Sequence, residues 1–323
     1  MLTSRVLPQI EFRIPIAPTI SFYNRVHFFC AALRRLGRGH VDSLVRIVVG
    51  DYADLDEVRR TNAWATQYNL QWHRVPEEVS AAHDYYGTSD FRYALPESSA
   101  DLVVLADADI ALVKPVAQDL SWMLCEEPCI AGHMAHIPPP LKFLEGSDLA
   151  ARDVWPFLFQ EFSIPFPHEL YRYSRDLAGE FPTAPAYYNL GFVALNWSAL
   201  RIVKNVICDV RDRLNKITQS EMRCQIALTL ISYKHAFKRA NLPAIFNAAN
   251  DEPYLRHNGV RPDDIKVLHY LRTNELDRDT FLTDAGRAIF LKGNFHNPVN
   301  QLLQQIGREI ITENLEFAHL TAV

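Results

Sequence analysis

The sequence predicts an α/β fold in which a mostly parallel sheet is flanked by helices. Three observations favour it. Strand-like and helix-like segments alternate over residues 10–75, and residues 102–105 form a short apolar run typical of a strand buried on both faces. The chain has 323 residues, 48% hydrophobic and 22% charged, which is enough to bury a large core. Alternating strands and helices are typical of parallel strands joined by right-handed crossovers.

The alternation begins near the amino terminus. Its expected order is strand, helix, strand, helix, strand, over residues 10–14, 22–36, 45–49, 54–67 and 70–75. The first helix is indicated by apolar residues at helical spacing, with Gly37 ending it, and the second by Asp54 as its cap. In a parallel sheet, ligands gather beyond the carboxyl ends of the strands, where Asp51 follows the second strand.

The most informative stretch is residues 100–116, ADLVVLADADIALVKPV. Its apolar strand ends in Asp107-Ala108-Asp109, and apolar residues resume at Ile110. Two carboxylates at the end of a buried strand are costly to desolvate unless a positive group lies beside them. Residues two apart in an extended chain point the same way, so Asp107 and Asp109 can converge on one cation. Oxygen ligands of this kind suit Mg²⁺ or Mn²⁺.

Other interpretations of Asp-x-Asp exist. The pattern also occurs by chance in solvated turns and helix caps, and a phosphatase-like signature uses the first Asp as a nucleophile. The absence of Thr around Ile110 and Ala111 disfavours the phosphatase interpretation. Glycine-rich phosphate loops do not occur in the sequence, so a metal held by the Asp pair would have to hold any nucleotide phosphates.

The wider segment FRYALP-ESSA-DLVVLADADIALVKPV, residues 91–116, resembles the corresponding region of GT-A glycosyltransferases, especially the retaining glycogenin and bacterial galactosyltransferase type. In that family an Arg-aromatic pair, a hydrophobic strand and Asp-x-Asp follow one another. Two later segments resemble the family in the same order: the Asn189-x-Gly191 strand, and an apolar strand that ends in His269. The resemblance implies a Rossmann-like GT-A fold with Mn²⁺ or Mg²⁺ bound by Asp107, Asp109 and His269.

The resemblance also implies an activity. It is the transfer of a sugar, with retention, from a nucleoside-diphosphate donor (a UDP-sugar foremost) to a hydroxyl of a glycan, lipid-linked or protein acceptor. The implied donor-binding residues are Arg92, Asp51, Asp107 and Arg272, and the implied catalytic residues lining the sugar are Asn189, Gln225 and Glu221. The family's His-x-x-Gly-x-x-Lys reads His269-x-x-Arg272-x-x-Glu275 here, so Arg272 is expected to take over the phosphate contact.

We expect one catalytic domain over residues 1–323. Its expected parts are a nucleotide and metal half (1–136), an insertion that is a possible acceptor region (137–186), a sugar and acceptor half (187–300) and an amphipathic C-terminal helix (301–323). The insertion is rich in proline and aromatic residues. An aromatic residue there, such as Trp155, is either part of the core or a platform for an acceptor sugar.

Charge and composition exclude several classes. The formal net charge of −5 argues against a general nucleic-acid binder. The sequence lacks a signal-peptide pattern and any run of about 18 apolar residues, so we expect a cytoplasmic protein, at most peripheral to a membrane. Two rival functions remain: a sugar-nucleotide pyrophosphorylase-like nucleotidyltransferase, disfavoured because residues 14–20 contain no glycine, and an inactive GT-A scaffold that acts as a binding protein.

Overall fold

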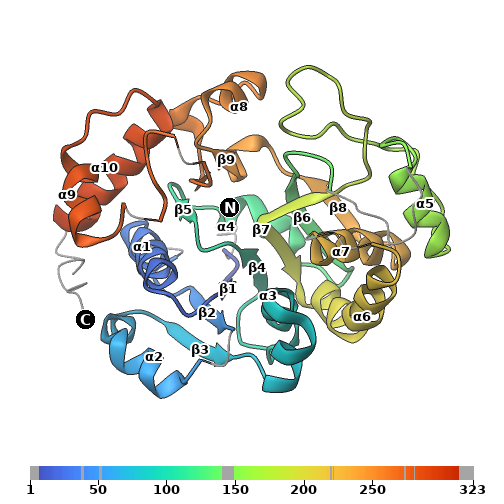
Figure 1. Cartoon of the computed structure of the whole chain (residues 1–323), viewed down its shortest axis with the longest axis horizontal. Helices are drawn as coiled ribbons and strands as arrows, with labels where there is room; N and C mark the ends of the chain where they lie inside the picture. The colour runs from blue at the N-terminus through green and yellow to red at the C-terminus, as the bar shows by residue number, and fades with distance from the viewer. Residues whose placement is uncertain are drawn as a thin grey trace, which may run out of the picture.

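The central sheet of the computed structural model has helices on both faces (Figure 1). The structure describes residues 7–37, 40–50, 53–139, 149–218, 220, 222–272, 274–279 and 281–312. Within these residues the sheet has seven strands in the order β3-β2-β1-β4-β7-β6-β8, and a smaller sheet has the order β5-β10-β9.

The large sheet is mostly parallel, as predicted. Its strands are β1 (Ile10–Ile16), β2 (Leu44–Val49), β3 (Leu70–Arg74), β4 (Leu102–Ala106), β6 (Cys129–Met134), β7 (Tyr188–Asn196) and β8 (Lys238–Asn241). β1, β2, β3 and β4 pair in parallel, as do β6 and β8, whereas β7 runs antiparallel to both β4 and β6. The antiparallel β7 was not anticipated, because an apolar run does not reveal the direction of its neighbours.

Both faces of β4 are buried, as its unbroken apolar sequence predicts. Leu102 and Val104 pack into the cluster under α1 (Ile20–Arg35). Val103 and Leu105 point the other way, into a cluster shared with α6 (Trp197–Asn215) and α7 (Arg223–Lys234). Because each such side chain gains about 1.5–3 kcal/mol on burial, the strand that leads to the Asp-x-Asp motif is fixed from two sides.

Two stretches of helix near the amino terminus differ from expectation. The helix predicted over residues 54–67 is divided into α2 (Leu55–Thr61), capped by Asp54, and the 3₁₀ turn η1 (Ala63–Gln67). The long α3 (Glu77–Ala94) was not predicted, because Gly87 and Thr88 interrupt its apolar spacing. It begins with two acidic residues that complement the helix dipole, and its last turn carries Arg92.

The small sheet brings distant parts of the chain together. It consists of β5 (Ile110–Leu112), β9 (Ala248–Ala249) and β10 (Val267–His269), and β5 pairs antiparallel with β10. The remaining short elements are α4 (Ala117–Leu120), η2 (Ser121–Met123), α5 (Val154–Glu161), η3 (Ala244–Phe246), α8 (Glu252–His257) and η4 (Pro262–Asp264).

The carboxy-terminal helices pack against the beginning of the chain. In Figure 1, α9 (Asp284–Lys292) and α10 (Pro298–Thr312) lie beside α1. The buried stripe of α10, Leu303, Ile306 and Ile310, joins a core cluster with Phe28 of α1. The amphipathic helix predicted from residue 301 is therefore present to Thr312, and residues 313–323 lie outside the described part of the chain.

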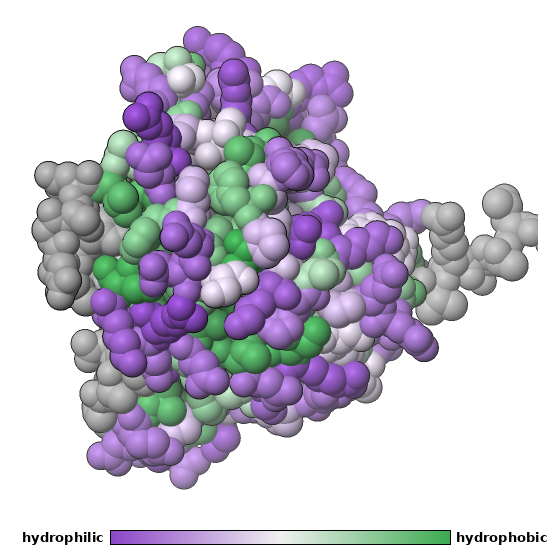
Figure 2. Space-filling model, turned by 90° about the vertical axis from the view of Figure 1, so that its right-hand side faces the viewer, coloured by the Kyte–Doolittle hydropathy of each residue, from purple (hydrophilic) through white to green (hydrophobic). Residues whose placement is uncertain are grey.

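Trp155 lies in the core. It is 2% exposed, its indole N–H donates to Tyr173 Oη over 2.9 Å, and its ring packs against Tyr187. This buried position favours the core interpretation over an acceptor platform. Figure 2 shows the face that carries α5, α6 and α7, where hydrophobic residues lie in separate groups divided by hydrophilic ones. Among the described residues, none of the helices has both the length and the hydrophobicity to span a bilayer.

Candidate active site

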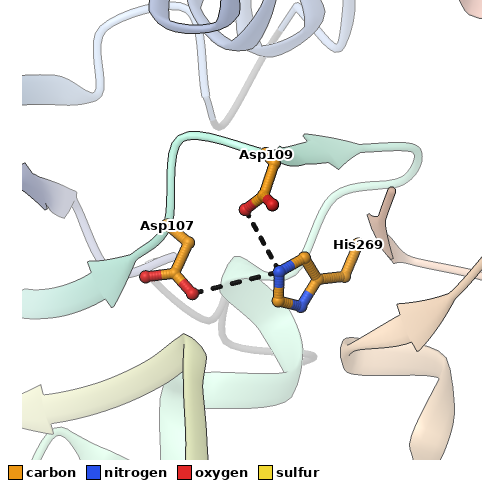
Figure 3. A group of neighbouring side chains, drawn as sticks. All are labelled: Asp107, Asp109 and His269. Atoms are coloured by element: carbon orange, nitrogen blue, oxygen red, sulfur yellow. Dashed lines mark hydrogen bonds and ion pairs between the residues drawn. The ribbon is translucent and has the colours of Figure 1, made fainter. Parts of the chain in front are cut away.

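The Asp-x-Asp motif links β4 to β5 and faces His269 (Figure 3). The pairing of β5 with β10 sets His269 opposite Ile110, one residue beyond the motif. His269 Nε2 lies 3.1 Å from Asp109 Oδ1 and 3.9 Å from Asp107 Oδ2. The ligand atoms of the three residues all lie within 4.8 Å of one another, so the side chains that were predicted to share a metal are brought together.

The two carboxylates have different surroundings. Asp107 is 40% exposed at its side chain, and burial of the site together with the neighbouring Asp109 raises its pKa. Burial alone would also raise the pKa of Asp109, but His269 and Arg278 outweigh it and hold that pKa below its ordinary value. Burial opposes the charged form of His269, yet Asp109 and Asp107 raise its pKa. The two carboxylates therefore favour the protonated form of the imidazole.

The residues fit a divalent cation. Two carboxylates and one imidazole are a donor set that suits Mn²⁺ or Mg²⁺. The second ring nitrogen of His269, Nδ1, lies 2.9 Å from Asn247 Oδ1, and Asn247 is fully buried. A hydrogen bond of this kind fixes the ring orientation and leaves Nε2 directed at the two carboxylates.

Gly191 allows the Asn-x-Gly strand to approach this centre. Its carbonyl accepts from the Asp107 N–H over 3.4 Å, and its own N–H donates to Asn189 Oδ1 over 2.8 Å. A Cβ atom at position 191 would lie 2.6 Å from His269 Cε1, closer than side chains allow. The site therefore requires glycine here, because a larger side chain would collide with the His269 ring and with Asn189 Oδ1.

Arg92, from the last turn of α3, and the start of α7 lie near Asp107. Arg92 is 1% exposed, and its Nε and Nη1 have no hydrogen-bond partner among the described residues. Its positive charge partly offsets the rise in the pKa of Asp107 that burial and Asp109 cause. Gln225 is buried in the first turn of α7. Its neighbour Cys224 lies within electrostatic reach of both Arg92 and Asp107. The start of α7 thus faces the centre, on the side of Arg92.

The remaining predicted residues have other outcomes. Asp51 and Glu221 lie outside the described part of the chain. Arg272 lies three residues after His269, beyond the end of β10. Its Nε lies 3.9 Å from Asp251, and its backbone N–H and carbonyl form hydrogen bonds with the Asn250 side chain. Glu275, at the position of the family's lysine, accepts from the backbone N–H groups of residues 296 and 297.

Sequence reasoning missed Arg278. Its Nη1 donates to Asp109 Oδ2 over 2.8 Å, so Asp109 is held between His269 on one oxygen and Arg278 on the other. The only signal was an arginine nine residues after His269, in a polar segment whose course the sequence does not predict.

Comparison with known proteins identifies the fold class of this chain. No protein-family model and no curated protein matches the sequence. Among solved structures, the bifunctional glycosyltransferase WbbM is similar with a TM-score of 0.53 and 14% identity over 84% of this chain. Mouse xyloside xylosyltransferase 1 is also similar, with a TM-score of 0.49 and 11% identity over 81% of this chain and 97% of that chain. The galactosyltransferase LgtC is similar with a TM-score of 0.49 and 18% identity over 86% of this chain and 93% of that chain.

The class defined by the sheet order and by the likeness to WbbM is the GT-A glycosyltransferase fold, as predicted. This chain matches 47% of the WbbM chain and so spans about half of that bifunctional protein's length. At these identities the likeness establishes the fold alone, and the activity has to be argued from the site.

Proposed function

We propose that this chain is a metal-dependent glycosyltransferase that moves a sugar from a nucleoside-diphosphate donor, a UDP-sugar foremost, to a hydroxyl acceptor with retention. One observation carries the proposal: within a GT-A fold, Asp107, Asp109 and His269 converge beyond the end of β4, where Gly191 approaches the same imidazole. A turn or a helix cap does not account for three ligands drawn from two segments about 160 residues apart.

Asp107, Asp109 and His269 would hold Mn²⁺ or Mg²⁺. When bound, the ion supplies positive charge that offsets the negative charge of a leaving diphosphate. The protein adds cationic groups of its own on one side of this centre. Arg278 already contacts Asp109, and the charge of Arg278 also acts on Arg272. Guanidinium groups suit phosphate because they present paired N–H donors.

Other residues would bind and orient the sugar. Arg92 offers buried N–H groups beside Asp107, which we assign to the donor. Asn189 and Gln225, with Glu221, are proposed to line the sugar ring, and Asp51 is proposed to recognise the base. In the proposed reaction the acceptor hydroxyl attacks the anomeric carbon on the face that the diphosphate leaves. The anomeric carbon–phosphate oxygen bond breaks, the glycosidic bond forms, and the hydroxyl proton passes to the leaving phosphate.

Binding of nucleotides tests this function. The melting temperature of the protein should rise with UDP or a UDP-sugar, and only when Mn²⁺ is present, because the Asp pair repels phosphate without it. Asp107→Asn and Asp109→Asn should abolish this rise and the slow hydrolysis of the donor. Asp209→Asn, which removes an exposed carboxylate on α6, is the matched control and should behave like the unmodified protein.

The rival functions give different results. A binding scaffold would neither hydrolyse nor transfer any donor sugar with Mn²⁺ present. A pyrophosphorylase would form a nucleotide sugar from a nucleoside triphosphate and a sugar 1-phosphate and would release pyrophosphate. Either result would exclude the proposed transfer reaction.

A further inference from the structure

A second charged cluster lies beside the metal centre, at Arg175, Arg272 and Asp251. Arg175 Nη2 lies 2.7 Å from Asp251 Oδ2, and Arg272 Nε lies 3.9 Å from the same oxygen. Asp251 is buried, whereas about a third of each arginine side chain is exposed. The Nε atoms of both arginines have no hydrogen-bond partner among the described residues. Two cations share one anion, so the cluster carries one net positive charge.

His136 borders the cluster with an unpartnered nitrogen. Its side chain is more than nine-tenths buried, Nδ1 lies 2.9 Å from Ser174 Oγ, and Nε2 has no partner in the described chain. The ring centroid lies 6.5 Å from that of His269. Burial foremost, and then the neighbouring positive charges, hold the pKa of His136 well below its ordinary value, so the ring is neutral. A buried polar atom without a partner destabilises the protein, and a ligand that hydrogen-bonds it would remove that cost.

Backbone contacts hold these groups in place. The N–H groups of Ser174 and Arg175 donate to the carbonyls of Ala135 and His136, each over 3.0 Å, which ties residues 174–175 to the end of β6. Asp251 caps α8 through its other oxygen. Arg175 therefore lies on a fixed segment, and it comes from the 137–186 stretch expected to contact an acceptor.

We propose that Arg175 and His136, with the adjoining edge of Arg272, form a subsite for the anionic group of an acidic acceptor, a sugar that carries a carboxylate or a phosphate. This inference rests on the proposed function in naming the ligand an acceptor. The exposed part of the Arg175 guanidinium binds the anion, and His136 Nε2 hydrogen-bonds a neighbouring group of the same sugar.

The position of Arg175 favours the acceptor over the donor diphosphate. Among the cations, His269 and then Arg92 act most strongly on Asp107, and His269 and then Arg278 act most strongly on Asp109, whereas Arg175 is not among the main ones. Arg278 contacts Asp109 of the metal centre, whereas Arg175 pairs with Asp251, which Arg272 also approaches. Arg175 therefore belongs to the Asp251 cluster and not to the groups that contact the two metal-binding aspartates.

The test compares acidic and neutral sugars. Glucuronate, glucose 6-phosphate and glucose are titrated into the whole protein by NMR, with and without UDP and Mn²⁺. We expect at least one of the acidic sugars to bind about tenfold more tightly than glucose. Arg175→Gln should weaken that binding about tenfold or more, as expected for loss of a charge-assisted hydrogen bond, and should change the Kd of UDP with Mn²⁺ less than twofold. Arg256→Gln, an exposed arginine of α8, is the matched control.

A second variant separates binding from folding. Arg175→Gln leaves the buried Asp251 with only its longer contact to Arg272, so it can destabilise the protein. Asp251→Asn keeps a cap for α8 and raises the net charge of the cluster from one to two. It should tighten binding of the acidic sugar severalfold and leave glucose unchanged, which a purely structural role of these residues would not produce.

The outcomes separate this subsite from the proposed function. Acidic sugars that bind no better than glucose would overturn the subsite, and so would an Arg175→Gln variant that loses UDP affinity but retains the acidic sugar. If UDP with Mn²⁺ does not bind the unmodified protein while the acidic-sugar results hold, the transfer function fails and the anion subsite stands.

Discussion

At the scale of the residue, the Asp-x-Asp pair is asymmetric. Asp109 is fixed between His269 and Arg278, which hold its pKa below the ordinary value and so favour its ionised form. Asp107 is more exposed, and its pKa is raised by burial and by Asp109. Asp109 is thus held in place by its two partners, whereas Asp107 is the carboxylate whose ionised form a bound cation would stabilise most.

We expect Arg278 to weaken metal binding and to strengthen nucleotide binding. Arg278→Gln removes a positive charge next to Asp109, so we expect Mn²⁺ to bind the nucleotide-free protein severalfold more tightly. UDP should then bind the metal-loaded protein about 10- to 100-fold more weakly, the range for loss of a charge-assisted hydrogen bond. Calorimetric titration with Mn²⁺ and then UDP measures both. Weaker Mn²⁺ binding in the variant would show instead that Arg278 is needed to orient Asp109.

His269 should make metal binding dependent on pH. A bound metal requires the neutral imidazole, so protons compete with it. Because its neighbouring carboxylates raise the pKa of His269 above 6.5, the competition begins at a higher pH than for an ordinary histidine. The Kd for Mn²⁺ should therefore increase as pH falls through this raised pKa, by about tenfold per pH unit once the ring is mostly protonated.

Substitution of His269 tests the same assignment. His269→Ala should raise the Kd for Mn²⁺ by about 10- to 100-fold and remove the pH dependence, with both aspartates still binding. His257→Ala, an exposed histidine of α8, is the control. An unchanged Kd in a folded His269→Ala protein would mean that His269 is an ordinary histidine at the end of a strand.

At the scale of the element, β7 approaches the centre through one glycine. Gly191→Ala would place a Cβ 2.6 Å from His269 Cε1, so the ring has to move. We expect the Kd for Mn²⁺ to rise at least about tenfold, comparable to loss of a group that orients a ligand. Gly259→Ala is an informative control: its φ of +62° strains an alanine by about 1–2 kcal/mol, so it should lower stability and leave metal affinity intact. Equal metal affinity in both variants would contradict this account of Gly191.

At the scale of the whole molecule, α10 closes the core on the side of α1. Ile306 is 1% exposed and packs in the cluster with Phe28, so Ile306→Ala should cost about 2–5 kcal/mol of unfolding free energy. Ile289→Ala, at a 72% exposed position on α9, should cost less than about 0.5 kcal/mol. Urea unfolding measures both values. Similar losses in the two variants would show that α10 is not part of the cooperative core.

Local patterns were sufficient to predict much of this protein. The buried β4 and the strand ending in His269 could be predicted because apolar runs reflect burial, and the cap at Asp54 because Asp is favoured at the start of a helix. The GT-A fold was predicted from the resemblance of residues 91–116 and the two later motifs to that family. The Asp-x-Asp pair could be predicted as a metal site because charge at the end of a buried strand is costly unless it is balanced. The helix α3 was missed because its packing overrides a weak apolar spacing.

Only the tertiary structure decided which charges meet. Arg278 lies 169 positions from Asp109, and their contact depends on the chain that follows β10, whose course no local pattern encodes. Arg175 and His136 join Arg272 because residues 174–175 pair with the end of β6 and Asp251 lies between the two arginines. From the sequence alone, an arginine in a polar segment has many possible ion-pair partners. Sheet pairing and burial select one, because a buried charge is stable only beside its counterion.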